Sequence, residues 1–155
     1  MLEPQRQPVM TIMIGLPRAG KTTYANKNKG QAVILCADEL RYLVYNQRFW
    51  GEGEPLMWSI HDIILKMLLQ QGADVVIDET NYTWESREPL ISLAKEYGYW
   101  VQGVVLSTPR EVCIGRAQAE GYSRIIPFIR KLSEMFDMPS LAEGLDHVLF
   151  VERKD

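Results

Sequence analysis

The sequence contains few cysteines, no long apolar run and no excess of positive charge. Its two cysteines, Cys36 and Cys113, lie far apart and in no zinc-ligand spacing, so we expect neither a disulfide framework nor a zinc site. No apolar run approaches the roughly 20 residues that cross a bilayer, and residues 1–7 lack the apolar stretch of a signal peptide. These absences predict a cytoplasmic protein with no membrane partner. The net charge of −3 argues against a protein that coats long nucleic acids, but not against one that grips a strand end.

Length and composition are those of one globular domain. A chain of 155 residues buries roughly 70% of the surface that its unfolded form exposes, which suffices for an independent core. We therefore expect a single domain over residues 1–155, with residues 1–8 as a flexible N-terminal extension and no room for a second catalytic domain.

Short runs rich in β-branched residues alternate with amphipathic stretches along the chain. This alternation is typical of an α/β fold, a parallel sheet with helices on both faces. The expected strands span residues 9–14, 32–36, 75–77, 100–106 and 148–151. A helix is expected between Pro55 and Gly72, because apolar residues recur there at helical spacing. The residues of this stripe, which we expect to face the core, are Leu56, Ile60, Ile63, Ile64, Met67 and Leu68.

The segment from Gly15 to Thr22 fits the Walker A pattern G-x-x-x-x-G-K-[ST] and directly follows the first expected strand. Glycines let backbone amides converge on phosphate oxygens, and the helix that begins near Gly20 points its positive end at the same anions. Lys21 supplies a cation to the terminal phosphates, and the Thr22 hydroxyl is expected to bind Mg2+. The segment therefore predicts binding of ATP or another nucleoside triphosphate. The residues expected to contact the nucleotide are Gly15, Pro17, Arg18, Ala19, Gly20, Lys21, Thr22 and Thr23.

Asp38 and Arg41 follow the second expected strand. In open α/β sheets ligands bind beyond the carboxyl ends of the strands, so both residues are expected near the phosphate loop. A carboxylate there can take the proton of an attacking hydroxyl. Arg41, three residues on, shares a helix face with Asp38 and can hold an anionic group of the acceptor. Two plainer interpretations stay open, namely Asp38 as a helix cap only and Arg41 as a solvated helix residue.

Asp78 and Glu79 end the third expected strand, as in a Walker B element that holds Mg2+ through its water shell. Adjacent residues at a strand end point to opposite faces, so we expect only one of the two carboxylates to serve the metal. The sequence leaves open which one. Thr80 and Asn81, which follow, are expected to line the acceptor pocket.

A helix is expected from Pro109 to Ala117, and the segment from Arg116 to Arg124 contains a glycine and has an arginine at each end. Such a segment is typical of a lid, whose cations close on the charge that develops during phosphoryl transfer. We therefore expect both arginines to be catalytic.

Together these motifs resemble the P-loop kinases that include phage-type polynucleotide 5′-kinases. The resemblance covers nearly the whole chain and implies an adenylate-kinase-like, five-stranded parallel sheet with a short lid. It also implies that Asp38 is the general base on a 5′-hydroxyl, that Arg41 contacts the acceptor's phosphate, and that Arg116 acts with Lys21 on the transferring group. The segments that carry it are residues 15–23, Asp38-x-x-Arg41, Thr80-Asn81 with Arg87 six residues on, residues 93–98, the lid from Arg116, and residues 143–148. Arg87 thus joins the expected acceptor-binding residues.

Two residues depart from the family pattern. The second lid arginine, four residues after the first, is replaced by Glu120, so we expect Arg124 to take over its role. Arg18 stands where small residues are common, either as an extra cation near the nucleotide or as a solvent-facing side chain. No phosphatase domain like that of the phage enzyme follows, so we expect kinase activity only.

Six aromatic residues flank the expected acceptor side, where their rings could stack on bases of a single strand. Core packing is the interpretation that we favour for most of these residues: Tyr42, Tyr45, Phe49, Trp50, Trp58 and Trp84. His61 and His147 are assigned no chemistry. The motifs favour a kinase for 5′-hydroxyl ends of DNA or RNA. A kinase for a nucleoside, sugar or nucleotide-sugar and a non-catalytic nucleotide-binding switch are the alternatives.

Overall fold

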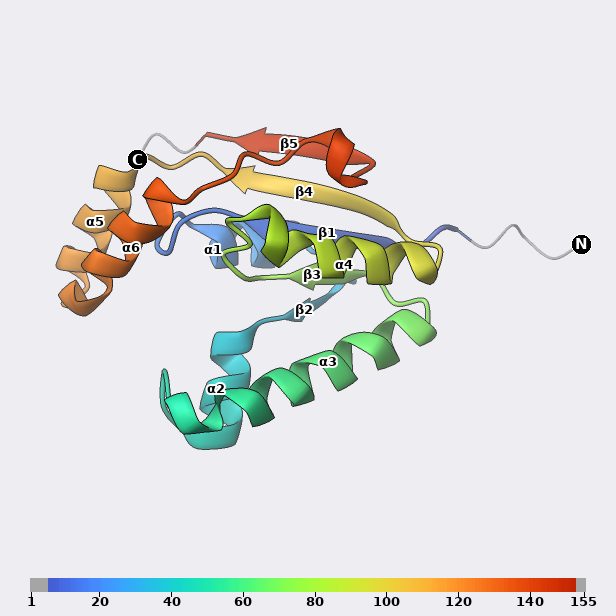
Figure 1. Ribbon diagram of the computed structural model, residues 1–155, viewed down its shortest axis with the longest axis horizontal. Coiled ribbons are helices and arrows are strands. Elements are labelled where there is room, and N and C mark those ends of the chain that lie inside the picture. The colour runs from blue at the N-terminus through green and yellow to red at the C-terminus, as the bar shows by residue number, and fades with distance from the viewer. Residues whose placement is uncertain (1–5, 153–155) are drawn as a thin grey trace, which may run out of the picture.

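Five parallel strands form one sheet in residues 6–152, the part of the chain that the computed structural model describes (Figure 1). The strand order is β2-β3-β1-β4-β5, so the first strand lies in the middle. The strands are β1 (Val9–Ile14), β2 (Val33–Leu35), β3 (Val75–Ile77), β4 (Trp100–Leu106) and β5 (His147–Val151). The predicted α/β fold with a five-stranded parallel sheet is confirmed. β2 is one residue shorter at each end than expected, and β5 begins one residue earlier.

Helices connect the strands and cover both faces of the sheet. They are α1 (Lys21–Asn28), α2 (Ala37–Tyr45), α3 (Glu54–Gln70), α4 (Trp84–Glu96), α5 (Arg110–Ala119) and α6 (Ile126–Glu134). Short 3-10 helices lie at Gly51–Gly53, Ser123–Ile125 and Leu141–Glu143. In Figure 1, α5 and α6 lie toward the end of the sheet to which the strand arrows point, and α2 and α3 lie beside the β2 edge.

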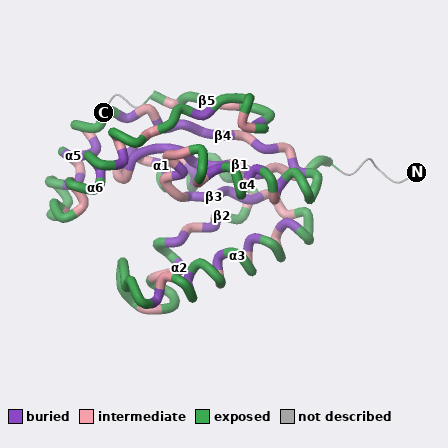
Figure 2. The backbone as a smooth tube through the Cα atoms, in the orientation of Figure 1, coloured by how far each residue is buried: buried purple, intermediate pink, exposed green. Residues whose placement is uncertain are grey.

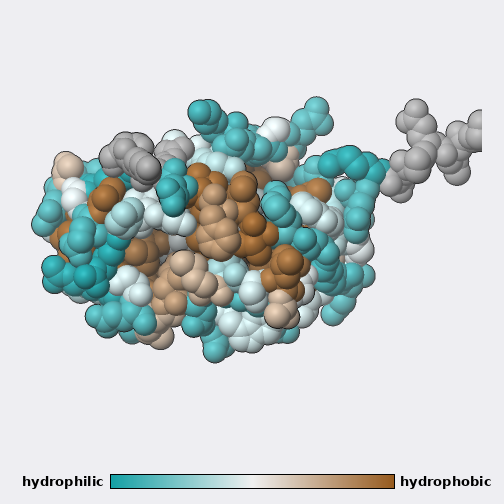
Figure 3. Space-filling model, turned by 90° about the horizontal axis from the view of Figure 1, so that it is seen from above, coloured by the Kyte–Doolittle hydropathy of each residue, from teal (hydrophilic) through white to brown (hydrophobic). Residues whose placement is uncertain are grey.

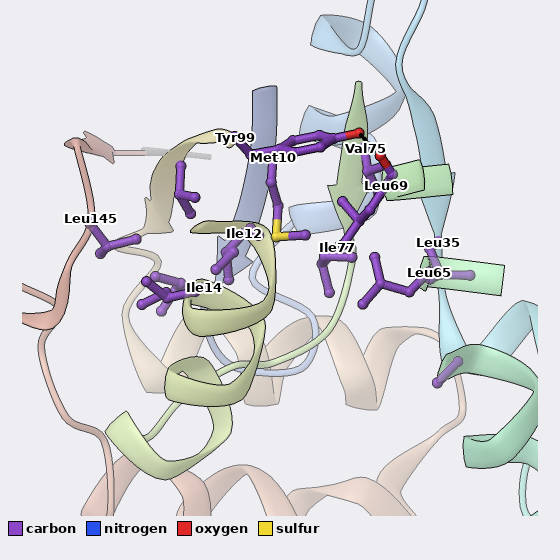
Figure 4. Packing of buried hydrophobic residues seen from close by; sticks show 14 of the residues in the cluster. Met10, Ile12, Ile14, Leu35, Leu65, Leu69, Val75, Ile77, Tyr99 and Leu145 are labelled. Carbon is purple, nitrogen blue, oxygen red and sulfur yellow. Dashed lines mark hydrogen bonds between the residues drawn. The ribbon is translucent and has the colours of Figure 1, made fainter. Parts of the chain in front are cut away.

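Alternate residues of β1 face two separate cores, because side chains of a strand point to opposite faces in turn. Met10, Ile12 and Ile14 are fully buried in the core shared with α3 and α4, which Figure 4 shows from close by. Met13 faces the second core, which includes residues of α1, α5 and α6. Figure 2 accordingly shows buried residues along β1, β3 and β4. The sheet is thus a fixed frame for the loops at its carboxyl end.

The predicted core face of α3 is wrong by about one position along the helix. The buried residues are Met57, His61, Leu65 and Leu69. Three residues of the predicted stripe are exposed, namely Leu56, Ile63 and Met67, and the other three border the core. Apolar residues surround more than half of this helix, so their spacing does not single out one face, and a histidine within the buried row disguises it.

Core packing, which we favoured for the aromatic residues, is wrong for most of them. The exposed ones are Tyr42, Phe49, Trp50, Trp58 and Trp84, whereas Tyr45 is half-buried. Trp50 stands edge-on to the Tyr45 ring, with ring centroids 5.0 Å apart. Because α2 packs chiefly against α3, only part of its surface is covered, and Tyr42 lies on the uncovered side.

β5 is an edge strand, and among the described residues it pairs with β4 alone. Its residues Leu149 and Phe150 are exposed. Figure 3, which looks onto this side of the molecule, shows apolar side chains among polar ones. This edge therefore leaves backbone groups and apolar side chains open together.

Residues 1–5 of the expected N-terminal extension lie outside the described residues. The next residues form hydrogen bonds: Arg6 with the carboxylate of Asp74, and Gln7 Nε2 with Gly98 O at 3.0 Å. Within the described part of the chain, no helix has the length and apolar character that a membrane span requires.

Candidate active site

The loops that follow β1, β2 and β3 meet at the carboxyl end of the sheet, because parallel strands all end on the same side. The phosphate loop follows β1, Asp38 lies in the first turn of α2 after β2, and Asp78 and Glu79 directly follow β3. Hydrogen bonds link the loop after β3 to both of the others. The three loops therefore form one site.

The phosphate loop is fixed by bonds from two other segments. Gly15 N donates to Thr80 O at 3.0 Å, and Thr108 Oγ1 donates to Ala19 O at 2.8 Å. Gly20 has a φ of 98°, a left-handed conformation that a side chain would strain, and α1 begins directly after it. The N-terminus of α1 is thereby directed at whatever anion lies in the loop.

Lys21 is folded against the phosphate loop. Its Nζ donates to Leu16 O at 2.8 Å, and its side chain is buried. Burial lowers the pKa of Lys21, and the nearby carboxylate of Asp78 opposes that shift. An ammonium group that has lost its water gains free energy by pairing with an anion such as a phosphate oxygen.

Thr22 and Asp78 bring two oxygen ligands together. Thr22 Oγ1 donates to Asp78 Oδ2 at 2.6 Å. The other oxygen, Asp78 Oδ1, is buried and has no hydrogen-bond partner among the described residues. Burial raises the pKa of Asp78, while the Thr22 hydroxyl and Lys21 act to lower it. A buried carboxylate oxygen left over beside a hydroxyl fits a hard cation such as Mg2+ or one of its waters.

Glu79 points away from this pair, toward the start of α2. Its Oε1 accepts a hydrogen bond from Ala37 N at 2.6 Å, at the first residue of a helix whose cap residue, Cys36, offers no side-chain bond. Burial raises the pKa of Glu79 to about 8. The adjacent carboxylates thus face different ways, as the alternation of a strand predicts, and Asp78 is the one beside Thr22.

His61, to which the sequence assigned no chemistry, lies next to Glu79. Its Nε2 is 4.0 Å from Glu79 Oε1, its side chain is buried, and this burial lowers its pKa. This neighbour was not expected, because the predicted stripe placed the wrong face of α3 toward the sheet. Because the apolar residues of α3 span a wide arc, their spacing alone could not reveal it.

Asp38 and Arg41 share one face of α2, as their spacing predicts. Arg41 Nη1 lies 2.7 Å from Asp38 Oδ1, and 77% of the Asp38 side chain is exposed. Asp38 is therefore open to an incoming hydroxyl group. Asp38 is not the cap residue, which is Cys36; it lies in the first turn of the helix, where a carboxylate also suits the helix dipole.

Arg41 is also held by Glu54, the first residue of α3. Its Nε and Nη2 each donate to one Glu54 oxygen at 2.7 Å, which makes a bidentate pair. The pairing raises the pKa of Arg41 and lowers that of Glu54. Only 13% of the Arg41 side chain is exposed, so its interpretation as a solvated residue is wrong. No sequence signal pointed to Glu54, which lies in a different helix.

Asn81 and Arg87 are buried beneath the site. Asn81 Nδ2 donates to Met13 O at 2.8 Å, and Arg87 Nη1 donates to Asn81 O at 2.9 Å. Arg87 is fully buried, and its Nε and Nη2 bind the two oxygens of Glu143 at 2.8 and 2.6 Å. These contacts fix the turn after β3 and do not support direct contact between Arg87 and an acceptor.

Arg116 and Glu120, four residues apart at the end of α5, both hold Arg18. Arg116 Nη1 donates to Arg18 O at 3.0 Å, and Arg18 Nη1 lies 2.9 Å from Glu120 Oε2. These residues border a pocket of about 330 Å³, lined by Arg18, Gly20, Lys21, Thr22, Thr23, Arg116 and Glu120. Three cations and one carboxylate suit this pocket to an anionic ligand.

The segment after α5 touches both sides of the site. The Arg48 Cζ, from the loop after α2, lies 4.4 Å from the centroid of the Tyr122 ring, and the Arg18 Cζ lies 5.3 Å from it. Arg124 lies in the 3-10 helix that follows, exposed and outside the residues that line the pocket. Its expected catalytic role stays a prediction.

Known proteins resemble this chain in sequence and in structure. The L-seryl-tRNA(Sec) kinase of Methanococcus maripaludis is 26% identical over 147 residues, which are 89% of this chain and 56% of that protein. This chain thus spans about half the length of that relative.

Three solved structures share the fold. The Mycobacterium tuberculosis APS kinase CysC, in complex with AMPPNP and APS, has a TM-score of 0.64 at 19% identity, over 97% of this chain and 92% of that one. A chain of the Pnkp1/Rnl/Hen1 RNA repair complex has a TM-score of 0.67 at 19% identity, over 88% and 48%. A chain from the PezAT toxin-antitoxin system of Streptococcus pneumoniae has a TM-score of 0.70 at 22% identity, over 96% and 68%.

A family model described as an AAA domain, AAA_33, matches residues 10–132, which run from β1 into α6 and include every loop of the site. Since that match covers most of the sheet and the whole phosphate loop, the chain belongs to the AAA_33 family of AAA domains and has the fold of a P-loop kinase.

Proposed function

We propose that the protein is an ATP-dependent phosphotransferase that transfers the γ-phosphoryl group to the 5′-hydroxyl end of DNA or RNA. The observation that carries this proposal is the open carboxylate of Asp38 at the same sheet edge as Lys21 and the Thr22–Asp78 pair. A protein that only binds nucleotide has no use for a base aimed at an acceptor. Similarity to a chain of an RNA repair complex and to a seryl-tRNA(Sec) kinase supports an acceptor that belongs to a nucleic acid.

In the proposed reaction, Asp38 takes the proton of the acceptor hydroxyl as the hydroxyl oxygen attacks the γ-phosphorus. The bond from that phosphorus to the bridging oxygen breaks, so ADP leaves and the acceptor becomes a phosphate monoester. Lys21 and Arg116 neutralise the charge of the transferring group, while the amides of the phosphate loop bind the remaining phosphates. Mg2+ bound by Thr22 and Asp78 would supply further positive charge to the phosphates.

On the acceptor side, Arg41 binds a phosphate next to the attacking hydroxyl and shares its fork with Glu54. Thr80, which is partly exposed, lines this side, and the buried Asn81 supports it through the bond to Met13 O. Arg87 acts as a positioning residue through its bond to Asn81 O. The rings exposed around α2 and α3, Tyr42, Phe49, Trp50 and Trp58, offer faces on which bases can stack.

A kinase for a small acceptor, such as a nucleoside, a sugar or a nucleotide-sugar, is the second candidate. It is favoured by the bonds of Arg41 to Glu54 and Asp38, because an acceptor phosphate has to compete with two carboxylates there. The net charge of −3 favours it too, because a long polyanion gains little from such a surface.

The test is to incubate the protein with γ-labelled ATP and magnesium, in parallel with 5′-hydroxyl DNA, 5′-hydroxyl RNA and a panel of nucleosides, sugars and nucleotide-sugars. The variant K21A, which lacks the cation of the phosphate loop, is the matched control. Label on an oligonucleotide end supports the proposal, whereas label only on a small molecule supports the second candidate. ATP binding with no transfer to any acceptor would reject both in favour of a nucleotide-binding switch.

A further inference from the structure

Arg18 occupies a strained position in the phosphate loop. Its φ is 68°, in the left-handed region that residues other than glycine rarely adopt. Arg116 Nη1 donates to its carbonyl oxygen at 3.0 Å, so α5 helps to hold this conformation. Strain of this kind persists only where surrounding contacts maintain it, and it clusters at functional positions.

The side chain of Arg18 lines the phosphate pocket and keeps one donor unused. Its Nη1 lies 2.9 Å from Glu120 Oε2, and its Cζ lies over the ring of Tyr122. Its Nε is buried and has no hydrogen-bond partner among residues 6–152. The guanidinium therefore stands beside the pocket with capacity for a further acceptor.

Glu120 is the one carboxylate among the residues that line this pocket, where the other charged residues are Arg18, Lys21 and Arg116. A nucleotide polyphosphate brings several negative charges close to Glu120, and these charges repel Glu120 and attract Arg18. The Glu120 side chain is 49% exposed, so it remains hydrated when its partner leaves. The ion pair is thus a contact that an incoming phosphate can replace.

We propose that Arg18 is a catalytic residue, which leaves Glu120 when nucleotide binds and donates hydrogen bonds to the γ-phosphoryl oxygens during transfer. This inference rests on the proposed kinase function. Arg18 forms no covalent bond, and its cation stabilises the charge that grows on the transferring group. It supplies, from the phosphate loop, the second cation beside Arg116 that the sequence analysis expected from Arg124.

Affinity for a transition-state mimic tests this role. Binding of magnesium-ADP is measured with and without aluminium fluoride, which mimics the phosphoryl group in the transition state of transfer. We expect R18A to keep its ADP affinity within about threefold, and to lose roughly 100- to 1,000-fold in turnover and in affinity for the ADP–fluoride complex. R18K should lose less, and R110A, which removes an exposed arginine of α5 outside the pocket, should lose nothing. Unchanged fluoride affinity and turnover in R18A would overturn the inference.

A purely structural role for Arg18, as the partner that neutralises Glu120, makes a different prediction. In that case R18A/E120Q would regain the lost affinity and turnover, because no carboxylate is left to neutralise. We expect R18A/E120Q to stay as impaired as R18A, and R18A/E120R to recover in part, because it returns a cation to the pocket wall. Recovery in R18A/E120Q would overturn the catalytic role, as would a loss in R124A with none in R18A.

The two proposals fail in distinguishable ways. A wild-type protein that binds no magnesium-ADP overturns the proposed function, and the role of Arg18 with it. Wild-type transfer together with a normal R18A overturns only the role of Arg18. The melting temperature of each variant, compared with that of the wild type, separates a loss of fold from a loss of function.

Discussion

Asp38 is the residue on which the proposed chemistry depends most directly. We expect D38N to lower kcat by about 100- to 10,000-fold, because an amide cannot take the proton of the acceptor. The affinity for ATP should stay nearly unchanged, since Asp38 is not among the residues that line the phosphate pocket. Label transfer measures kcat, and the fluorescence of a labelled nucleotide measures affinity. E39Q, the adjacent exposed acid of α2, is the matched control, and undiminished turnover in D38N would remove Asp38 from the role of base.

Arg41 should act on the acceptor and not on the nucleotide. We expect R41A to raise the acceptor KM by about 10- to 100-fold, the loss of a charged hydrogen bond, with a larger effect on acceptors that carry a phosphate beside the hydroxyl. R41K keeps the charge but loses the planar fork that also binds Glu54. Its acceptor KM should therefore lie between those of the wild type and R41A. Steady-state kinetics on paired acceptors measures the difference. Equal effects on acceptors with and without that phosphate would argue against a phosphate clamp.

Arg87 should contribute mainly to the stability of the fold and only indirectly to acceptor binding. We expect R87M to lower the free energy of unfolding by about 3 to 5 kcal/mol, because Glu143 is left with an unpaired charge against a buried site. The double variant R87M/E143Q should regain part of that loss. Urea denaturation measures both, with R110A of an exposed pair as the control. Normal stability of R87M together with a raised acceptor KM would instead support direct binding of the acceptor by Arg87.

Motif spacing could predict the site residues that follow a strand directly, and it could not predict their partners. Asp38, Asp78 and the phosphate loop lie close together because each follows a strand, and the carboxyl ends of the strands lie together in any parallel sheet. Glu54 and His61 were missed, because each reaches the site from α3, whose rotation about its axis the sequence leaves open. Side-chain pairs between separate elements depend on packing, which has no period along the chain.

At the scale of elements, the Arg41–Glu54 pair ties α2 to α3. Both side chains are mostly buried, and Arg41 lowers the pKa of Glu54. A carboxyl group whose pKa is lower in the folded state adds stability above its unfolded pKa, and this contribution is lost as pH falls through the lowered value. We expect wild-type protein to lose more stability than E54Q between pH 7 and pH 3, and E54Q to be less stable at pH 7 by about 1 to 3 kcal/mol.

Unfolding in urea at the two pH values measures that difference. E111Q, which breaks an exposed pair with Arg110, should change neither stability nor its pH dependence by more than about 0.5 kcal/mol. Parallel pH profiles of E54Q and wild type would contradict the prediction. Such a result would mean that Glu54 contributes no more than a surface charge.

Strands were predictable at this scale because their apolar runs are short and bounded. β1 and β3 match the expected spans, and β2 and β5 differ by single residues at their ends. The buried face of α3 was not predictable, because its apolar residues span too wide an arc. A strand has only two faces between which to choose, whereas a helix can be rotated by small steps.

At the scale of the whole molecule, nucleotide binding should stabilise the fold. Magnesium-ATP at 100 times its dissociation constant adds about 2.7 kcal/mol, which for a chain of this length raises Tm by roughly 5 to 10 °C. We expect K21A to lose most of this shift while its own Tm is not lowered, because a buried ammonium costs free energy. Thermal unfolding with and without nucleotide measures both. K66A, on the exposed side of α3, is the control, and a full shift in K21A would contradict the assignment of the phosphate loop.

The order of the strands has a consequence for how the protein is made. β1 leaves the ribosome first, yet both of its neighbours, β3 and β4, are synthesised later, and Thr108 donates to Ala19 O from beyond β4. The phosphate loop is therefore synthesised long before the residues that fix its conformation. Nascent chains stalled before Thr108 is synthesised should not bind to immobilised ATP. Binding should begin only in chains long enough for Thr108 to have left the exit tunnel.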